Sequence, residues 1–277
     1  MQDMSPLQQF IETHPRLFVL TGAGVSTDSG IPDYRNREGE WKRAPPVTFQ
    51  AFVHDQPTRQ RYWARSLIGW PHVGSALPNT AHHALAQLEH RGQVELLVTQ
   101  NVDRLHQRAG SEKVVDLHGR LDEVRCMDCD WRQPRDAFQQ QLIERNLAWQ
   151  QLDASIAPDG DADLEGQDFS RFEIPPCSRC GGMVKPDVVF FGESVPRGRV
   201  DAATQAWQAA DAVLVVGSSL MVYSGYRFVQ AAAKAGKPVA AVTLGLTRAD
   251  ALLNLKVDAR CSDALAFLLD PGRLIAN

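Results

Sequence analysis

The chain has 277 residues, of which 44% are hydrophobic and 22% charged, the usual balance of a globular protein with a large buried core. A formal net charge of −4 and a pI near 6.1 argue against nucleic acid as the main partner. No apolar run approaches the roughly 18–20 residues that cross a bilayer, and the N-terminus lacks the basic and apolar regions of a signal peptide. We therefore expect a cytoplasmic protein that binds neither nucleic acid nor a membrane.

The first half of the chain alternates helical patterns with short apolar runs of strand length. Serine and asparagine are good helix caps, proline fits a first helical turn, and glycine ends helices, so these residues mark the boundaries. In chain order the sequence predicts a helix from Ser5 and Pro6, a strand at 16–22, mostly helix at 48–70 with a break near Pro57, a helix from Asn79 to Gly92, and strands at 94–99 and 113–119.

The second half begins with a region of different character, 120–184, which holds two cysteine pairs. Between these pairs, residues 157–168 are acidic, contain glycine and have no periodicity, so we expect a mobile loop there. The rest of the chain returns to alternating elements. The sequence predicts strands at 187–193, 211–219 and 238–245, and helices at 225–236 and 262–269.

Apolar strands that alternate with helices indicate an α/β protein with a doubly wound parallel sheet covered on both faces. Ligands of such sheets bind outside the carboxyl ends of the strands. Small and polar residues gather at these predicted strand ends, which is the first indication of a functional site. They lie at 22–24, 100–103, 118, 217–219 and 243–245.

The loop "TGAGVSTDSGIPDYR" after the first strand is similar to a phosphate-binding turn but does not match the dinucleotide fingerprint. Gly22 and Gly24 form G-x-G, but Thr27 occupies the position of the third glycine, and Gly30 comes three residues late. Glycines let backbone N–H groups approach an anion near a helix start. A tight strand-to-helix turn without a ligand explains the pattern equally well.

Polar side chains also follow two later strands. Gln100, Asn101 and Asp103 come directly after 94–99, and so dense a polar cluster is more typical of a site than of scaffold. A simple helix cap by Asn101 is the alternative. His118 follows the next strand and is the side chain best suited to exchange a proton near neutral pH. The other histidines look like surface or packing residues.

Four of the five cysteines form two C-x-x-C pairs, "CMDC" and "CSRC". In a reducing compartment two such pairs indicate a metal rather than disulfides, and four thiolates are the closed ligand set of structural zinc. We therefore predict one structural zinc, held by Cys126, Cys129, Cys177 and Cys180. Incidental thiols are the alternative. Cys261 stands alone and is expected to be a small buried residue.

Taken together, the motifs resemble the sirtuin family of NAD-dependent protein deacylases, over about residues 16–269. "GAGVSTDSGIPDYR", "TQNVDRLH", "LHG", the cysteine pairs, "KPDVVFFGE" and "GSSL" occur in the order typical of that family, and "PDYR", "RYWAR" and "YSGYRF" favour its class II branch. The resemblance implies that NAD is a consumed co-substrate. It implies a cofactor site of Gly22, Ala23, Gly24, Thr27, Asp33, Tyr34, Arg35, Gln100, Asn101, Asp103, Gly217, Ser218, Ser219, Thr243, Leu244, Gly245 and Cys261.

The resemblance also implies the reaction. The amide oxygen of an acyl-lysine attacks the ribose as nicotinamide leaves, and the acyl group then moves to ADP-ribose. Asn101 and Asp103 would act at the nicotinamide end, with His118 as general base on a ribose hydroxyl. The acyl-lysine protein or peptide would add as a strand beside Val189, Phe190, Gly192 and Glu193.

Two further features concern specificity. Thr243 and Leu246 stand where relatives commonly have asparagine and proline, so NAD affinity could differ. Tyr62 and Arg65 have the Y-x-x-R spacing that relatives use to bind acidic acyl groups, and they share one helix face. An aromatic packing face with a solvated arginine explains the same residues as well.

The resemblance divides the chain into a Rossmann-like NAD-binding domain, a helical insertion and a zinc module. The NAD-binding domain spans 1–45, 92–120 and 185–277. The helical insertion spans 46–91, and the zinc module spans 121–184. Two other functions remain open. The protein could be a mono-ADP-ribosyltransferase, or a catalytically silent NAD sensor or interaction module. A hydride-transferring dehydrogenase is disfavoured because the fingerprint fails.

Overall fold

A six-stranded parallel sheet forms the centre of the larger part of the molecule in this computed structural model, which describes residues 4–42, 46–151, 164 and 166–269. The strand order is β3-β2-β1-β7-β8-β9, and every neighbouring pair is parallel. The predicted doubly wound sheet is therefore confirmed. The strands are β1 (Leu17–Thr21), β2 (Val94–Thr99), β3 (Val114–Asp116), β7 (Ala212–Val216), β8 (Val239–Val242) and β9 (Leu255–Val257).

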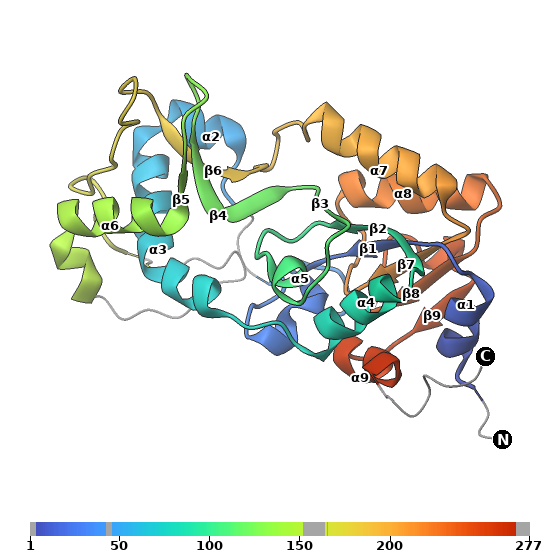
Figure 1. Cartoon of the computed structure of the whole chain (residues 1–277). Helices are drawn as coiled ribbons and strands as arrows, with labels where there is room; N and C mark the ends of the chain where they lie inside the picture. Colours follow the sequence, from blue (N-terminus) through green and yellow to red (C-terminus); the bar gives the residue numbers. More distant parts are fainter. Residues whose placement is uncertain (1–3, 43–45, 152–163, 165, 270–277) are drawn as a thin grey trace.

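Helices cover both faces of this sheet (Figure 1). Successive side chains of a strand point to opposite faces, so Val19 and Leu214 pack in one apolar cluster while Phe18 and Val213 pack in another. Every residue of β1, β7 and β8 is buried, which explains their continuous apolar sequences. The first cluster includes α1 (Pro6–Thr13), α4 (Thr80–His90) and α9 (Cys261–Leu265), and the second includes α7 (Arg197–Ala209) and α8 (Tyr223–Lys234).

A second, antiparallel sheet lies at the other end of the molecule (Figure 1), in the order β5-β4-β6. Its apolar core contains Phe52, Trp63 and Phe138 from the helices around it, together with Cys126 and Cys177. The strands are β4 (Gly119–Cys126), β5 (Arg132–Pro134) and β6 (Val184–Val188); the helices are α2 (Phe49–His54), α3 (Gln56–Ser75) and α6 (Arg135–Arg145). The remaining helix is α5 (Leu105–Arg108), and short 3₁₀ turns span Ala23–Val25, Thr27–Ser29, Leu147–Gln151, Asp250–Leu252 and Ala266–Leu269.

The predicted helix starts are confirmed at two caps. Ser5 Oγ accepts a hydrogen bond from the backbone N–H of Gln8, at 3.2 Å. Asn79 and His82 form a reciprocal capping box at the start of α4. The predicted break in the 48–70 helix falls at Asp55, which caps α3, and α3 continues to Ser75, beyond the predicted end.

One predicted strand is wrong. Of residues 187–193 only the first two are strand, and they end β6 in the small antiparallel sheet, not in the parallel one. The predicted strand 113–119 is shorter, because β3 stops at Asp116 and Gly119 already begins β4. The predicted helix 262–269 starts at Cys261 and ends as a 3₁₀ turn. Most of the predicted mobile loop, 157–163 and 165, lies outside the described residues.

A membrane-crossing helix is absent from the residues that the structure describes, since none combines the required length with the required hydropathy.

Candidate active site

A cavity of about 1050 Å³ opens at the carboxyl ends of the parallel strands. It lies where the strand order reverses, between β1 and β7, which is the usual ligand site of doubly wound sheets. The loops after these two strands touch. The Gly24 N–H donates to the Gly217 carbonyl at 2.8 Å, and a Cβ added at Gly24 would lie 2.9 Å from that oxygen. Glycine at this position therefore lets the two loops close against each other.

The glycine loop folds differently from a standard dinucleotide turn. After β1 the chain makes two 3₁₀ turns, Ala23–Val25 and Thr27–Ser29, and Gly30 ends the second with a φ of 84°. Since no α-helix starts here, the third glycine of the fingerprint has no helix to pack against a strand. This explains why Thr27 is accepted at that position, where its hydroxyl donates to the Gly24 carbonyl at 3.1 Å.

Most of the predicted cofactor residues line the cavity. Three of them do not: Thr27, Gly245 and Cys261. Cys261 is buried in the apolar cluster with α1 and α4, which confirms its interpretation as a small packing residue. The predicted residues that line the cavity are Gly22, Ala23, Gly24, Asp33, Tyr34, Arg35, Gln100, Asn101, Asp103, Gly217, Ser218, Ser219, Thr243 and Leu244.

The segment after Asp33 forms one wall of the cavity. The Arg35 guanidinium stacks over the Trp41 ring at 3.9 Å and donates to the Gly39 carbonyl at 2.7 Å. At the far end of this segment the Arg37 carbonyl accepts the N–H of Leu246 at 2.7 Å. A proline at 246 has no N–H and could not make this bond. Leucine at this position therefore allows the hydrogen bond that joins the segment after Asp33 to the loop after β8.

Ser26 connects the two polar residues that follow β2. Its hydroxyl donates to Asp103 Oδ2 at 2.7 Å and accepts from Asn101 Nδ2 at 2.9 Å. His82 Nδ1 accepts the Asn79 backbone N–H, so Nε2 carries the proton and lies 3.4 Å from Ser26 Oγ. The Asp103 carboxylate also accepts the Leu105 N–H at 2.9 Å, while burial raises its pKa. Asn101 and Asp103 are thus held in fixed orientations at the cavity wall.

His118 lies in the short link between β3 and β4, where the two sheets meet. Its Nδ1 is 3.0 Å from the Gln100 carbonyl oxygen, and its Nε2 is 2.7 Å from Ser224 Oγ. Burial lowers the pKa of the imidazole to about 4, so the ring is neutral at pH 7. A neutral histidine on the wall of a cavity can accept a proton from a bound hydroxyl.

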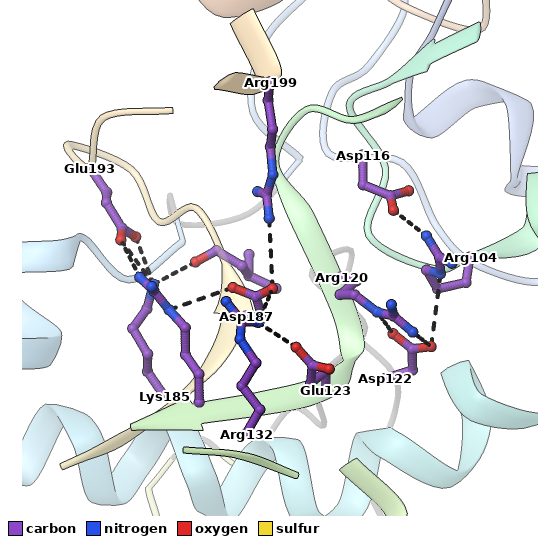
Figure 2. Close-up of polar contacts among 12 residues, drawn as sticks. Arg104, Asp116, Arg120, Asp122, Glu123, Arg132, Lys185, Asp187, Glu193 and Arg199 are labelled. Atoms are coloured by element: carbon purple, nitrogen blue, oxygen red, sulfur yellow. Dashed lines mark hydrogen bonds and ion pairs between the residues drawn. The ribbon is translucent and has the colours of Figure 1, made fainter. Parts of the chain in front are cut away.

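The turn after β6 supplies another part of the cavity wall. Val189, Phe190, Gly192 and Glu193 all line the cavity. The Lys185 ammonium lies 2.8 and 3.0 Å from the two oxygens of the Glu193 carboxylate (Figure 2). The Phe190 N–H also donates to this carboxylate, at 3.0 Å. Lys185 is only 1% exposed. The same ammonium donates to the Val188 carbonyl at 2.7 Å.

The two residues of the Y-x-x-R motif differ in position. Tyr62 is buried, lines the cavity and packs edge-to-face on Phe190, with ring centroids 5.3 Å apart. Arg65 is half-buried on α3 and is not among the described lining residues. The arrangement places the aromatic ring of the motif in the cavity wall, and the role of Arg65 stays a prediction.

The four paired cysteines come together at the end of the small sheet. Their sulfur atoms all lie within 4.8 Å of one another, with Cys126 Sγ 3.5 Å from Cys180 Sγ and Cys129 Sγ 3.8 Å from Cys177 Sγ. Tetrahedral zinc with bonds of about 2.3 Å separates its sulfur ligands by about 3.8 Å. The cluster therefore fits one structural zinc. All four ligands would be protein sulfur, which leaves no position for a substrate.

Several residues in the cavity or directly behind its wall were missed by sequence reasoning. Ser26 and Ser224 are single hydroxyls whose partners are distant in sequence, so no local pattern identifies them. Lys185 is an ordinary lysine in the sequence, and only its burial against Glu193 in the structure shows that it supports the cavity wall. Trp41 could have been found, because an aromatic residue in a glycine- and charge-rich loop needs a packing partner.

Comparison with known proteins identifies the family. A model of the Sir2 family matches residues 22–224. The chain belongs to the Sir2 family. The predicted resemblance to sirtuins is therefore confirmed. An NAD-dependent protein deacetylase of Bordetella bronchiseptica is 67% identical over 266 residues, which cover 96% of this chain and 97% of that protein.

Two further relatives extend the comparison. The mitochondrial NAD-dependent protein lipoamidase sirtuin-4 of Bos taurus is 46% identical over 273 residues, covering 98% of this chain and 86% of that protein, in line with the predicted class II branch. A solved Sir2 structure with a p53 peptide and NAD+ is 29% identical, has a TM-score of 0.77, and is matched over 98% of this chain and 99% of that one.

Proposed function

We propose that this Sir2 family member is an NAD-dependent protein-lysine deacylase that transfers the acyl group to ADP-ribose and releases nicotinamide. The observation that carries the proposal is the position of His118. It lines the same cavity as Asn101 and Asp103, and its Nε2 is the basic nitrogen of the ring. The printed names of the relatives, and the solved Sir2 structure with a p53 peptide and NAD+, support it.

Each part of the cavity has chemistry suited to one part of the reaction. Asn101 and Asp103, fixed by Ser26, would orient the nicotinamide end. The loops after β7 and β8, with Gly217 and Thr243, would hold the adenosine end. His118 would accept the proton of a ribose hydroxyl as the acyl group moves to that oxygen. No side chain needs to act as nucleophile, because the protein contributes positioning and a base.

The acyl-lysine peptide would lie along the turn after β6. This turn shares the cavity with His118, and the Val189 N–H donates to the His118 carbonyl at 2.7 Å, so peptide and base would be held by neighbouring backbone. We propose that dicarboxylic or branched acyl-lysines are accepted alongside acetyl-lysine, with Tyr62 and Arg65 as the recognising residues. The aromatic ring of Tyr62 in the cavity wall supports this.

The thiolate cluster supports an intracellular setting. Four cysteines that must remain reduced to bind zinc suit a reducing compartment, and we infer that the protein acts in the cytoplasm. The zinc would hold the small sheet together and take no part in the chemistry.

A panel of acyl-lysine peptides incubated with NAD and read by mass spectrometry tests the proposal. We expect O-acyl-ADP-ribose, free nicotinamide and deacylated peptide from the wild type, and roughly 10²–10⁴-fold less product from His118→Ala, with zinc content retained. ADP-ribosylated protein instead of O-acyl-ADP-ribose would favour the transferase alternative. No nicotinamide release from any peptide would favour the silent sensor. A ratio of acetyl to acidic acyl turnover unchanged by Arg65→Met would refute the acyl specificity.

A further inference from the structure

Ser224 contacts the imidazole that the proposed function uses as its base. It is the second residue of α8 and lines the cavity together with His118. The N-cap of this helix, Val222, makes no side-chain hydrogen bond, and the Ser224 hydroxyl is directed to the histidine, with Oγ 2.7 Å from Nε2. This hydroxyl is therefore hydrogen-bonded to Nε2, the nitrogen that has to accept a proton in the proposed reaction.

The directions of the two hydrogen bonds to His118 follow from their partners. The Gln100 carbonyl oxygen, 3.0 Å from Nδ1, can only accept, so Nδ1 carries the proton. Nε2 of the neutral ring then has a lone pair, and the Ser224 hydroxyl must donate to it. Together the two bonds select a single tautomer, the one with Nε2 as the basic atom.

The two partners of the ring belong to one packed unit. Gly225, the residue after Ser224, lies so close to the Gln100 side chain that an added Cβ would overlap it. The Gln100 amide donates to Ser218 Oγ at 3.3 Å, on the loop that leads from β7 into α8. The hydroxyl that bonds Nε2 and the carbonyl that bonds Nδ1 are consequently fixed relative to each other. The imidazole is held at both nitrogens.

We propose that Ser224 is a positioning residue for the acyl transfer: its hydroxyl donates to Nε2 and so orients the His118 ring, whose Nδ1–H tautomer the Gln100 carbonyl selects, and it releases Nε2 to a ribose hydroxyl of the bound substrate. This inference rests on the proposed function. The ribose O–H proton passes to Nε2 as the ribose oxygen bonds to the acyl carbon, and the C=N electron pair of that carbon moves to the lysine nitrogen, which later leaves as the amine when the C–N bond breaks. Ser224 itself gains and loses no covalent bond. A serine hydroxyl can then turn and accept from the protonated Nε2, since it is both donor and acceptor.

The first test is spectroscopic and needs no turnover. The imidazole ¹⁵N shifts of His118 are compared among the wild type, Ser224→Ala and Ser224→Thr, all as full-length zinc-loaded protein. In Ser224→Ala we expect the Nε2 resonance to move downfield towards that of a nitrogen without a donor, while Nδ1 stays protonated. Ser224→Thr keeps a hydroxyl and should retain the wild-type shift. An unchanged Nε2 shift in Ser224→Ala, or a threonine variant that behaves like alanine, overturns the proposal.

The second test separates the two chemical steps. Exchange of labelled nicotinamide into NAD reports the step before His118 acts, and formation of O-acyl-ADP-ribose reports the step after it. Loss of one hydrogen bond to the base should slow acyl transfer in Ser224→Ala roughly five- to tenfold and alter exchange by less than about twofold. Ser75→Ala removes an exposed hydroxyl outside the cavity and should change neither rate.

The outcomes distinguish this inference from the proposed function. Equal losses in both steps, or a melting temperature lowered well below that of the wild type, would give Ser224 a merely structural role and overturn the proposal. If the wild type releases no nicotinamide, the proposed function fails, but the ¹⁵N shifts still decide whether the Ser224 hydroxyl donates to Nε2 of His118.

Discussion

His82 and His106 are buried and His118 is half-buried near the loops that follow the parallel strands, and their hydrogen bonds distinguish the proposed base, His118, from the other two. His82 uses Nδ1 for the Asn79 N–H and Nε2 for Ser26, and His106 Nε2 pairs with the Thr21 hydroxyl at 2.9 Å. Neither lines the cavity. His118 lines it, and its Nε2 is bonded only by a hydroxyl that can rotate. Burial holds all three pKa values below the usual range, so burial alone does not identify the base.

The lowered pKa of His118 predicts how activity depends on pH. A base with a pKa of about 4 stays unprotonated as the pH falls from 7.5 to 5.5 and is lost only when the pH falls through about 4. We therefore expect kcat/KM to change little over this range, whereas a histidine with an ordinary pKa of about 6.5 would cut it about tenfold at pH 5.5. The measurement is kcat/KM against pH, with NMR titration of His118 in parallel. An acid limb near pH 6.5 assigned to His118 would contradict the prediction.

For single residues, the sequence predicts those that belong to recognisable motifs. It misses those whose role is to hydrogen-bond another residue of the site. Asn101, Asp103 and His118 follow predicted strands, and strand ends converge in a parallel sheet, so their meeting could be inferred. Ser26 and Ser224 lie 75 and 106 positions from the side chains that they bond. A contact at such sequence distance leaves no pattern in a single chain.

The turn after β6 shows how a strong strand signal can fail. The run "VVFFG" has strand propensity, but the ladder ends at Val188, which pairs with Gly119. Beyond it Phe190 stacks on Phe52, with centroids 4.9 Å apart, and Phe191 packs against Trp41 at 5.7 Å. Both rings therefore make tertiary contacts where the strand ladder has already ended. Packing overrides propensity here, as is common for β-formers.

Ion pairs hold this turn in place. Lys185 is the central group, bonded to Glu193 and to the Val188 carbonyl, while Asp187 on the same strand meets Arg132 at 2.9 Å and Arg199 of α7 at 3.6 Å (Figure 2). The buried ammonium thus ties the strand end to the end of the turn. The turn forms part of the cavity wall, so the shape of the cavity depends on Lys185, which itself lies outside the cavity.

Lys185→Met should loosen the turn and weaken peptide binding. The change leaves Glu193 without its main partner, and breaking a buried ion pair costs about 3–5 kcal/mol of stability. If about 1.4 kcal/mol of this lost stability must be supplied to reorder the turn when the peptide binds, KM for the acyl-peptide rises about tenfold. KM for NAD changes little. Steady-state kinetics with each substrate varied separately measures both values.

Matched variants make this test specific. Lys185→Arg keeps the charge and should restore much of the peptide affinity, whereas Lys113→Met removes an exposed lysine and should have no effect. A rise in both KM values, or a fall in kcat alone, would show that the ion pair does not act on peptide binding through the turn after β6.

At the scale of the whole molecule, the two sheets meet at His118. Strand β3 of the parallel sheet ends at Asp116, β4 of the antiparallel sheet begins at Gly119, and His118 lies between them in the chain. The other end of β4 is Cys126, the first of the four clustered cysteines. A zinc at that end would therefore stabilise the strand that follows His118 and, through pairing of β4 with β6, the turn after β6 as well.

The sequence predicts this organisation only in part. The parallel sheet and the cysteine cluster are confirmed, because continuous apolar strands and paired C-x-x-C motifs are strong local signals. The antiparallel pairing of β4 with β6 is not visible in either strand alone, since it joins residues near 119–126 to residues near 184–188. The predicted domain boundaries placed these strands in different parts of the chain and stay a prediction.

Removing the zinc should therefore abolish activity without touching a substrate contact. Cys180→Ser leaves three thiolates, and we expect it to lose the metal and several kcal/mol of stability, which at roughly 2–4 °C per kcal/mol lowers the melting temperature by about 10 °C or more. Deacylation should fall below detection, because both the link that holds His118 and the turn after β6 lose their support. Metal analysis, calorimetry and the peptide assay on the same samples measure the three effects.

The fifth cysteine provides the control. Cys261 lies in the apolar core of the parallel sheet, and Cys261→Ala should keep a full equivalent of zinc. Wild-type protein stripped by a chelator should regain activity when zinc is returned, as expected for a structural ion. If stripped protein keeps both its melting temperature and its acyl transfer, the small sheet is stable on its own apolar core. The position of the base would then be fixed from the parallel sheet alone, through the Gln100 carbonyl and Ser224.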